Sequence, residues 1–154
     1  MKFKLLLAGK TDERYLREGS EMYAGRLAHY IKLDIFSLPS VKETNPVRQR
    51  EMEAVRFMKN IDPSDFVVLL DEHGSRMSSV EFAGFIRKKS MGGTRCIVFV
   101  TGGPFGHGEA VRQRADFELS LSPMTFSHQM VRLFFLEQLY RAMTIIKGEK
   151  YHHG

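Results

Sequence analysis

The sequence predicts an α/β protein with a mainly parallel sheet flanked by helices. Short apolar segments alternate along the chain with longer segments of helical periodicity, an order typical of this class. Residues 66–70 and 96–100 are continuous apolar runs, as expected for strands that are buried on both faces of a parallel sheet. Turn-forming residues bound both runs, and the length of 154 residues suits one domain over residues 1–154.

Two strands and two helices are expected in the first part of the chain. Gly9 ends the first strand. Thr11 or Asp12 is suited to cap the next helix, because a side-chain oxygen can accept a free N–H at a helix start. Pro39 closes the second strand, and a polar loop separates it from the second helix. The expected bounds are 3–8 and 31–38 for the strands, and about 13–29 and 47–60 for the helices.

Three strands and three helices are expected in the rest of the chain. Ser78 starts a helix, and Glu81 three residues later completes a capping box. Gly92 and Gly93 end this helix, since glycine is common just beyond a helix end. The expected bounds are 66–70, 96–100 and 117–121 for the strands, and 78–91, about 109–115 and about 128–147 for the helices.

The last of these helices is apolar on nearly every side between residues 130 and 146. An amphipathic surface helix would show one apolar stripe, so this helix is expected to be buried on more than one face. One face is predicted to meet the sheet and another a second subunit, as in a homodimer. The alternative is a central helix in a monomer. Glu137 and Arg141 lie four residues apart and can pair along the helix.

Loops follow three of the apolar strands, over residues 70–74, 101–108 and 122–127. Ligands bind beyond the carboxyl ends of the strands in open parallel sheets, so these loops are predicted to form the binding site. The middle loop is rich in glycine, which lets backbone approach a ligand closely, although an ordinary tight connection is equally compatible. Its spacing matches neither G-x-G-x-x-G nor a phosphate loop, which disfavours a dinucleotide or a nucleoside triphosphate.

The charge of the chain is basic, with 23 Lys and Arg against 18 Asp and Glu and a net charge of +5. This balance suits a polyanionic partner such as nucleic acid. No membrane span is expected, because no apolar run is long enough, and the apolar N-terminal stretch is too short for a signal peptide. The protein is therefore expected in the cytoplasm. No carboxylate cluster has metal-ligand spacing, so no metal is expected.

The most specific signal is the C-terminal sequence from residue 122 to residue 153. It contains SPMTFSHQMVR at 122–132, EQLYRA at 137–142 and YHH at 151–153. These segments resemble the C-terminal signature of the RlmH family, which are SPOUT-class methyltransferases of the bacterial large-subunit rRNA. The glycine loop GGPFG, the strand end LLD before it and the N-terminal LAGK also resemble the family. The resemblance covers essentially the whole chain.

The resemblance implies a SPOUT-type α/β fold with a deep trefoil knot in the C-terminal third of the chain. It implies a homodimer, with pockets for S-adenosylmethionine formed by the knot loops at the subunit interface. It also implies the reaction, which is methylation of N3 of a pseudouridine in 23S rRNA within the assembled ribosome. Periodicity by itself would not predict a knot, because knots are essentially absent from most folds.

Two groups of site residues are implied when the family's positions are carried over. The cofactor group is Leu70, Gly102, Gly103, Ser122, Pro123, Met124, Thr125, Phe126 and Ser127. The group for RNA and the target base is His128, Arg132, Arg141, Tyr151, His152 and His153. The chain departs from the family pattern where His107 and Gly108 extend the glycine loop, and where Ser127 stands in place of a common proline.

The reaction suggests a role for five residues of the second group, all but His153. N3 must lose its proton, and His152 or His128 is the candidate base, since histidine titrates near neutral pH. Arg132 or Arg141 would stabilise the negative charge on the target base, and Tyr151 would stack on it. Plainer roles are also open: His128 could cap the last helix, and the terminal histidines could form a frayed tail.

A second function from a different class is a non-catalytic ribosome-binding or assembly factor on the same fold. The intact glycine loop and the intact 122–127 loop favour the enzyme. Cofactor binding separates the two functions, because an assembly factor has no need of S-adenosylmethionine. A nucleotide hydrolase is disfavoured, since the chain has no lysine-bearing phosphate loop.

Overall fold

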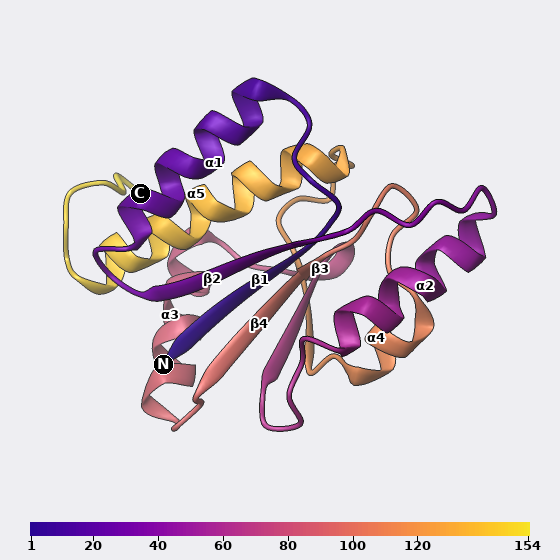
Figure 1. The fold of residues 1–154 in the computed structure, drawn as a ribbon. Coiled ribbons are helices and arrows are strands. Elements are labelled where there is room, and N and C mark those ends of the chain that lie inside the picture. Colours follow the sequence, from indigo (N-terminus) through magenta and orange to yellow (C-terminus); the bar gives the residue numbers. More distant parts are fainter.

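Five parallel strands form one sheet in the computed structural model, which describes residues 1–154 (Figure 1). The strands are β1 (Lys2–Ala8), β2 (Lys32–Leu38), β3 (Phe66–Arg76), β4 (Cys96–Thr101) and β5 (Phe117–Ser120). Their order in the sheet is β2-β1-β4-β3-β5, and every neighbouring pair is parallel. The predicted fold class is therefore confirmed.

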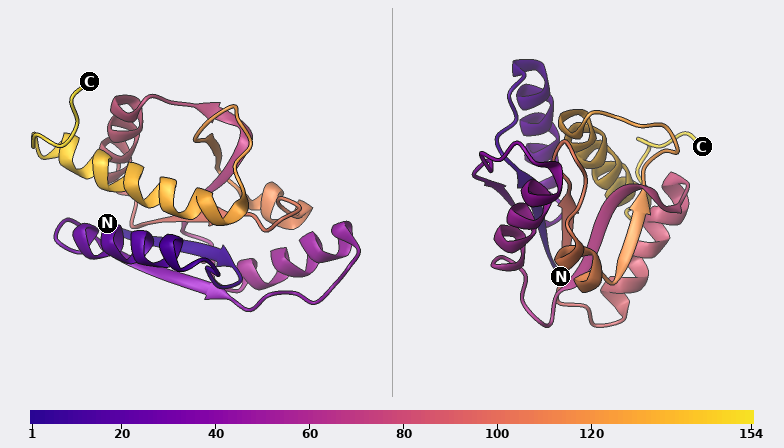
Figure 2. Two further views of the ribbon diagram at one scale, coloured as in Figure 1. Left: turned by 90° about the horizontal axis from the view of Figure 1, so that it is seen from above. Right: turned by 90° about the vertical axis from the view of Figure 1, so that its right-hand side faces the viewer.

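Helices cover both faces of this sheet, because successive side chains of a strand point to opposite faces. Leu5 and Leu7 of β1 join the core beneath α1, α3 and α5, whereas Leu6 joins the core beneath α2 and α4. The right-hand view of Figure 2 shows α5 between α1 and α3. The helices are α1 (Arg14–Leu27), α2 (Pro46–Met58), α3 (Ser79–Met91), α4 (Glu109–Arg114) and α5 (His128–Ile146).

Strand β4 lies at the centre of the sheet and is buried at all of its residues. It pairs with β1 on one side and with β3 on the other, and both faces meet helices. An apolar run without alternation is what such a position requires, since neither face meets water. The expected burial of residues 66–70 and 96–100 is confirmed, with Phe66 half-buried at the start of β3.

Helix α5 is the central helix of one layer, packed between α1 and α3 and against the sheet. Its buried apolar side chains are Phe135, Leu136, Leu139, Ala142 and Met143. The flanking helices account for much of the apolar surface that suggested a second subunit. Phe134 on the same helix stays 37% exposed, so an apolar surface is still left toward solvent.

Two local predictions were wrong. Residues 71–74 were expected to form a loop, but β3 continues to Arg76, because β5 pairs with Ser75 and Arg76 after a shift in register. Helix α1 begins after Glu13, and neither Thr11 nor Asp12 caps it with a side chain. The hydroxyl of Thr11 instead accepts a hydrogen bond from Arg132. The capping box of Ser78 and Glu81 is confirmed at the start of α3.

The threading of the C-terminal third through a knot stays a prediction, because strand order does not establish it. The single domain over residues 1–154 also stays a prediction. What the fold does establish is the placement of the carboxyl ends of β3, β4 and β5 at one edge of the sheet, since the three strands are parallel neighbours.

Phe135→Ala should lower the free energy of unfolding by about 3–5 kcal/mol, because it leaves a cavity in the core. Phe135 is fully buried, and its ring centroid lies 4.6 Å from that of Phe99. Urea denaturation of wild type and variant measures the change. Val55→Ala, at a helix position that is 56% exposed, should stay within about 0.5 kcal/mol of wild type. Equal effects of the two substitutions would contradict this account of the core.

Candidate cofactor pocket and C-terminal cluster

A pocket of about 630 Å³ lies at the carboxyl ends of β3, β4 and β5. Its walls come from residues 70–73, 101–107, 121–122 and 124–128, together with Arg112, Leu119 and Val131. The volume falls in the range of sites that hold small molecules. The predicted meeting of the three segments at one edge of the sheet is thus confirmed, although the first of them is strand rather than loop.

Most of the residues predicted to hold the cofactor line this pocket. They are Leu70, Gly102, Gly103, Ser122, Met124, Thr125, Phe126 and Ser127. Pro123 instead lines a shallow neighbouring depression with Glu72 and His73. Of the residues predicted for the RNA and the target base, His128 lies in the same pocket.

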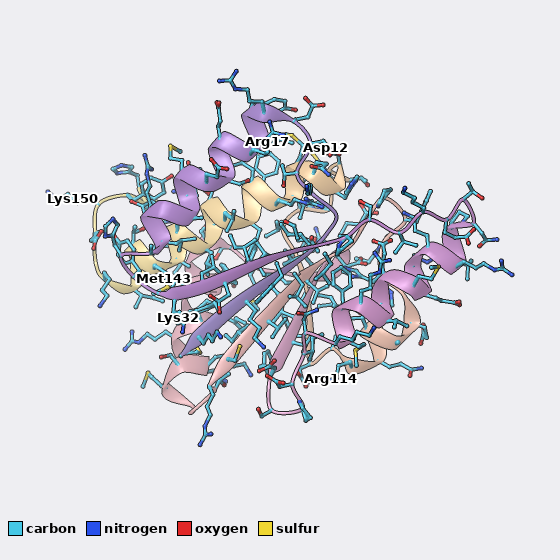
Figure 3. All side chains as sticks on the ribbon, in the orientation of Figure 1. Asp12, Arg17, Lys32, Arg114, Met143 and Lys150 are labelled. Carbon is cyan, nitrogen blue, oxygen red and sulfur yellow. The ribbon has the colours of Figure 1, made fainter.

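The largest cavity lies elsewhere, at the amino ends of β1 and β2. It measures about 830 Å³, and its lining is mostly apolar. Lys32 and Met143 belong to it and lie near one another in Figure 3. None of the predicted site residues lines it. Its size does not make it the better candidate for the cofactor site, because most residues predicted to hold the cofactor lie at the opposite edge of the sheet.

The glycine loop closes on itself beside the pocket. The N–H of Gly106 donates to the carbonyl of Gly103 at 3.1 Å, and Gly106 has a φ of 83°. Positive φ is favourable for glycine and costly for other residues. A Cβ on Gly102 would lie 3.0 Å from the backbone of Gly106, so this turn also needs a small residue there. The loop is both a tight connection and a pocket wall.

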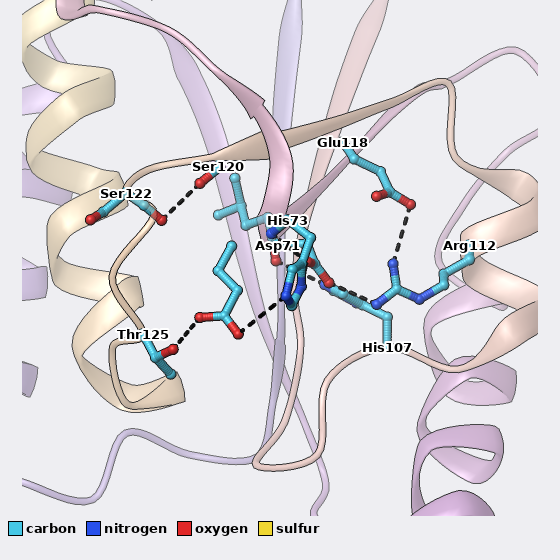
Figure 4. Close-up of polar contacts among 10 residues, drawn as sticks. Asp71, His73, His107, Arg112, Glu118, Ser120, Ser122 and Thr125 are labelled. Atoms are coloured by element: carbon cyan, nitrogen blue, oxygen red, sulfur yellow. Dashed lines mark hydrogen bonds and ion pairs between the residues drawn. The ribbon is translucent and has the colours of Figure 1, made fainter.

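An ion-pair network forms one polar side of the pocket (Figure 4). Arg112 of α4 lies 2.7 Å from Asp71 and 3.3 Å from Glu118. Burial acts to raise the pKa of Asp71, but the N–H of His73 and the guanidinium of Arg112 outweigh it, and the pKa falls below its usual value. Arg112 was not predicted from the sequence, because nothing in the sequence of a short helix indicates the partners of its arginines.

His107 is buried beneath the pocket, with its ring Nε2 2.9 Å from the carbonyl oxygen of Leu70. Since a carbonyl can only accept, Nε2 carries the proton, and Nδ1 is left as a buried atom without a partner. Burial lowers the pKa of His107. His107, from the extension of the glycine loop, thus holds the backbone of β3 at Leu70, a predicted cofactor residue.

Hydrogen bonds link the 122–127 segment to β3 and to α5. The hydroxyl of Thr125 donates to the carboxylate of Glu72 on β3, as Figure 4 shows. The Ser127 side chain accepts the N–H of Met130 at 3.2 Å and caps α5. The cap of the last helix is therefore Ser127 rather than His128, which is the first helical residue.

Comparison with known proteins finds relatives that match nearly the whole chain. A family model described as a predicted SPOUT methyltransferase matches residues 1–152. The chain is 48% identical to Ribosomal RNA large subunit methyltransferase H of Christiangramia forsetii and 46% identical to that of Porphyromonas gingivalis, covering 99% of each chain. It is 46% identical to that of Geotalea daltonii, covering 99% of this chain and 100% of the relative.

The chain belongs to the SPOUT methyltransferase family. SPOUT methyltransferases use S-adenosylmethionine as methyl donor, so the cofactor prediction is confirmed. The residues present fit that group: the pocket has the required size, and glycine backbone, hydroxyls and an aromatic ring line it. No helix of this methyltransferase is long and apolar enough to cross a membrane. No group of three metal-ligating side chains comes together in it.

Arg132 of this methyltransferase lies away from the cofactor pocket and is only 1% exposed. Its guanidinium donates to the carbonyls of Ala8 and Gly9, at 2.6 and 3.0 Å, and to the hydroxyl of Thr11 at 3.0 Å. These bonds join α5 to the end of β1. Its predicted action on the target base stays a prediction, and the contacts seen here are those of a structural residue.

The C-terminal residues of the methyltransferase gather at the far end of α5. Arg141 forms the expected ion pair with Glu137, and one of its nitrogens lies 3.2 Å from Nδ1 of His152. Tyr151 donates to Glu137 at 3.0 Å, and its ring lies 4.7 Å from the Arg141 guanidinium. Burial, with the hydroxyl of Tyr23 and the carboxylate of Glu137 as further causes, raises the pKa of Tyr151.

This C-terminal cluster and the cofactor pocket are separated within one chain. His128 and Arg141 stand at the two ends, about 20 Å apart at 1.5 Å rise per residue. The tail is not frayed at Tyr151 and His152, which are half-buried, whereas His153 is exposed. One chain therefore does not bring its two predicted groups of site residues together.

Arg132→Ala should lower the free energy of unfolding by about 3 kcal/mol, because it removes a buried donor and strands its acceptors. Arg17→Ala is the matched control, since Arg17 is exposed and bonds only the carbonyl of Asp12, at the start of α1 (Figure 3). Chemical denaturation of both variants measures the difference. An Arg132→Ala protein of wild-type stability that has lost methyl transfer would instead favour the role on the target base.

His107 should make the folded state less stable as the pH falls. Its pKa is lowered in the folded protein, so below the ordinary value of about 6.5 the unfolded chain binds a proton that the folded protein does not. The loss is at most about 1.4 kcal/mol per pH unit. His107→Gln should flatten the fall in unfolding free energy between pH 7 and 5, measured in urea. The exposed control His29→Asn should keep the wild-type slope.

Proposed function

We propose that the protein transfers the methyl group of S-adenosylmethionine to N3 of a pseudouridine in 23S rRNA. The single observation that carries the proposal is the pocket at the ends of β3, β4 and β5, built by the segments predicted to hold this cofactor. The relatives are named for the large-subunit rRNA, and the alignments with them run over nearly the whole of both chains. A non-catalytic assembly factor would have no use for this pocket.

Different residues of the chain would bind the cofactor and remove the proton from N3. S-adenosylmethionine would supply an electrophilic methyl group, and the residues that line the pocket would hold it; positioning of this kind can contribute roughly 7–11 kcal/mol. His128 borders the pocket, and burial lowers its pKa, so its imidazole is free at neutral pH to take the N3 proton. His152 is the second candidate base, in the C-terminal cluster with Arg141 and Tyr151.

The working form in this proposal is a homodimer in which the C-terminal cluster of one protomer approaches the pocket of its partner. The separation of the two groups in one chain supports this, because a base and a charge-stabilising arginine must both reach the target. An exposed apolar surface is also present beside the pocket, where Phe126 and Phe134 pack together and Met124 is 72% exposed.

Light scattering at micromolar concentration should show a particle with the mass of two chains.

The proposed place of action is the cytoplasm, on the assembled ribosome, because the substrate nucleotide is part of 23S rRNA. The basic balance of the chain, +5 overall, suits this partner. Phosphate contacts weaken as salt rises, so binding to ribosomes should fall with ionic strength.

The decisive experiment is transfer of a labelled methyl group to ribosomes that lack the native modification, followed by mapping of the labelled nucleotide. Label at one pseudouridine of 23S rRNA supports cofactor, substrate and position together. No label from a folded protein that binds S-adenosylmethionine would show that the substrate is wrong. No label and no cofactor binding would favour the assembly factor.

Gly103→Ala should weaken binding of S-adenosylmethionine by about tenfold or more. A Cβ at this position would lie 2.9 Å from Oε1 of Glu53 and closer still to the second carboxylate oxygen, so the loop or the buried Glu53 side chain must move. Isothermal calorimetry with wild type and variant measures the loss. Gly84→Ala, where a Cβ would meet nothing within 4 Å, should bind as wild type does. Undiminished binding to Gly103→Ala would place the cofactor away from this loop.

A further inference from the structure

A buried carboxylate lies directly behind the glycine loop. Glu53 belongs to α2, and its side chain points toward the loop rather than toward solvent, with only 6% of the residue exposed. Its carboxylate is close enough to Gly103 that a Cβ there would come within 2.9 Å of Oε1. Glu53 itself does not line the pocket, so the thickness of the loop backbone separates its charge from a bound ligand.

The folded chain gives this carboxylate no hydrogen bond that accounts for its burial. Oε1 of Glu53 is buried without a partner. The one charged group that acts on it is Arg56, three residues later, whose guanidinium donates to the carbonyl of Pro39. Burial raises the pKa of Glu53, which means that a negative charge here is held at a cost. An unpaired buried charge beside a binding site suggests a partner that arrives with the ligand.

The methyl donor and its product differ in charge at one atom. S-adenosylmethionine carries a positive sulfonium, whereas S-adenosylhomocysteine, the product left after transfer, carries a neutral thioether. Their other charged groups are the same, so any attraction to the sulfonium appears in the ratio of their affinities. The Glu53 carboxylate behind the glycine loop attracts the positive sulfonium through a few ångströms of protein, where charges are screened less than in water.

We propose that Glu53 is a positioning and specificity residue that makes the pocket bind S-adenosylmethionine in preference to S-adenosylhomocysteine. It acts through space, from behind Gly103, and does not touch the reacting atoms. Loss of the positive charge during transfer removes the attraction, so the product leaves more readily than the methyl donor. The proposal rests on the proposed function, because it requires the cofactor to lie against the glycine loop.

The test is calorimetric binding of S-adenosylmethionine and S-adenosylhomocysteine, each alone, to the full chain and to Glu53→Gln. Glutamine keeps the shape and removes the charge. The variant should bind S-adenosylmethionine about tenfold more weakly and S-adenosylhomocysteine within about twofold of wild type. The matched control is Glu51→Gln, which removes the same charge from an exposed position on α2 and should change neither affinity.

Equal weakening of both ligands in Glu53→Gln would overturn the proposal and leave Glu53 as a support of the loop. A second measurement needs no variant: sinefungin, which carries an amine in place of the sulfonium, should bind wild type more tightly than S-adenosylhomocysteine does. Equal affinities of wild type for all three ligands would also overturn it. Failure of wild type to bind any of them would instead contradict the proposed function.

Discussion

Strand β4 has water on neither side, since β1 and β3 flank it and helices cover both of its faces. This burial is the constraint on which the rest of the structure depends. It requires an apolar strand and a helical layer on each face, and it requires parallel neighbours, because the connections pass through those helices. The carboxyl ends of β3, β4 and β5 then fall at one edge, where the cofactor pocket forms.

Polar groups at that edge are held by one another and by the backbone. Arg112 fixes Asp71 and Glu118, His107 fixes the carbonyl of Leu70, and Thr125 bonds Glu72. The three pocket segments are thus linked before any ligand arrives, which reduces the entropy that binding must overcome. Glu53 differs from these groups, since it is a carboxylate buried behind the glycine loop with an oxygen that no group in the chain satisfies.

Helix α5 connects two polar regions that the chain keeps apart. Its first turn borders the pocket through His128, and its C-terminal half carries Glu137 and Arg141, against which Tyr151 of the following tail packs. Arg132 lies between them, and its two terminal nitrogens bond the end of β1. A rigid helix cannot bring its own ends together, and this separation is the ground on which the homodimer is proposed.

The sequence by itself determined the fold class, the order of the elements and the segments that meet at one edge of the sheet, because apolar runs, caps and turns act locally. Tertiary structure decided the rest. The extension of β3 depends on pairing with β5, a strand far along the chain. Whether Arg132 meets a ligand or the carbonyls of Ala8 and Gly9 depends on how α5 packs. The partners of Arg112 and the isolation of Glu53 arise for the same reason, since burial and charge pairing are properties of neighbours in space.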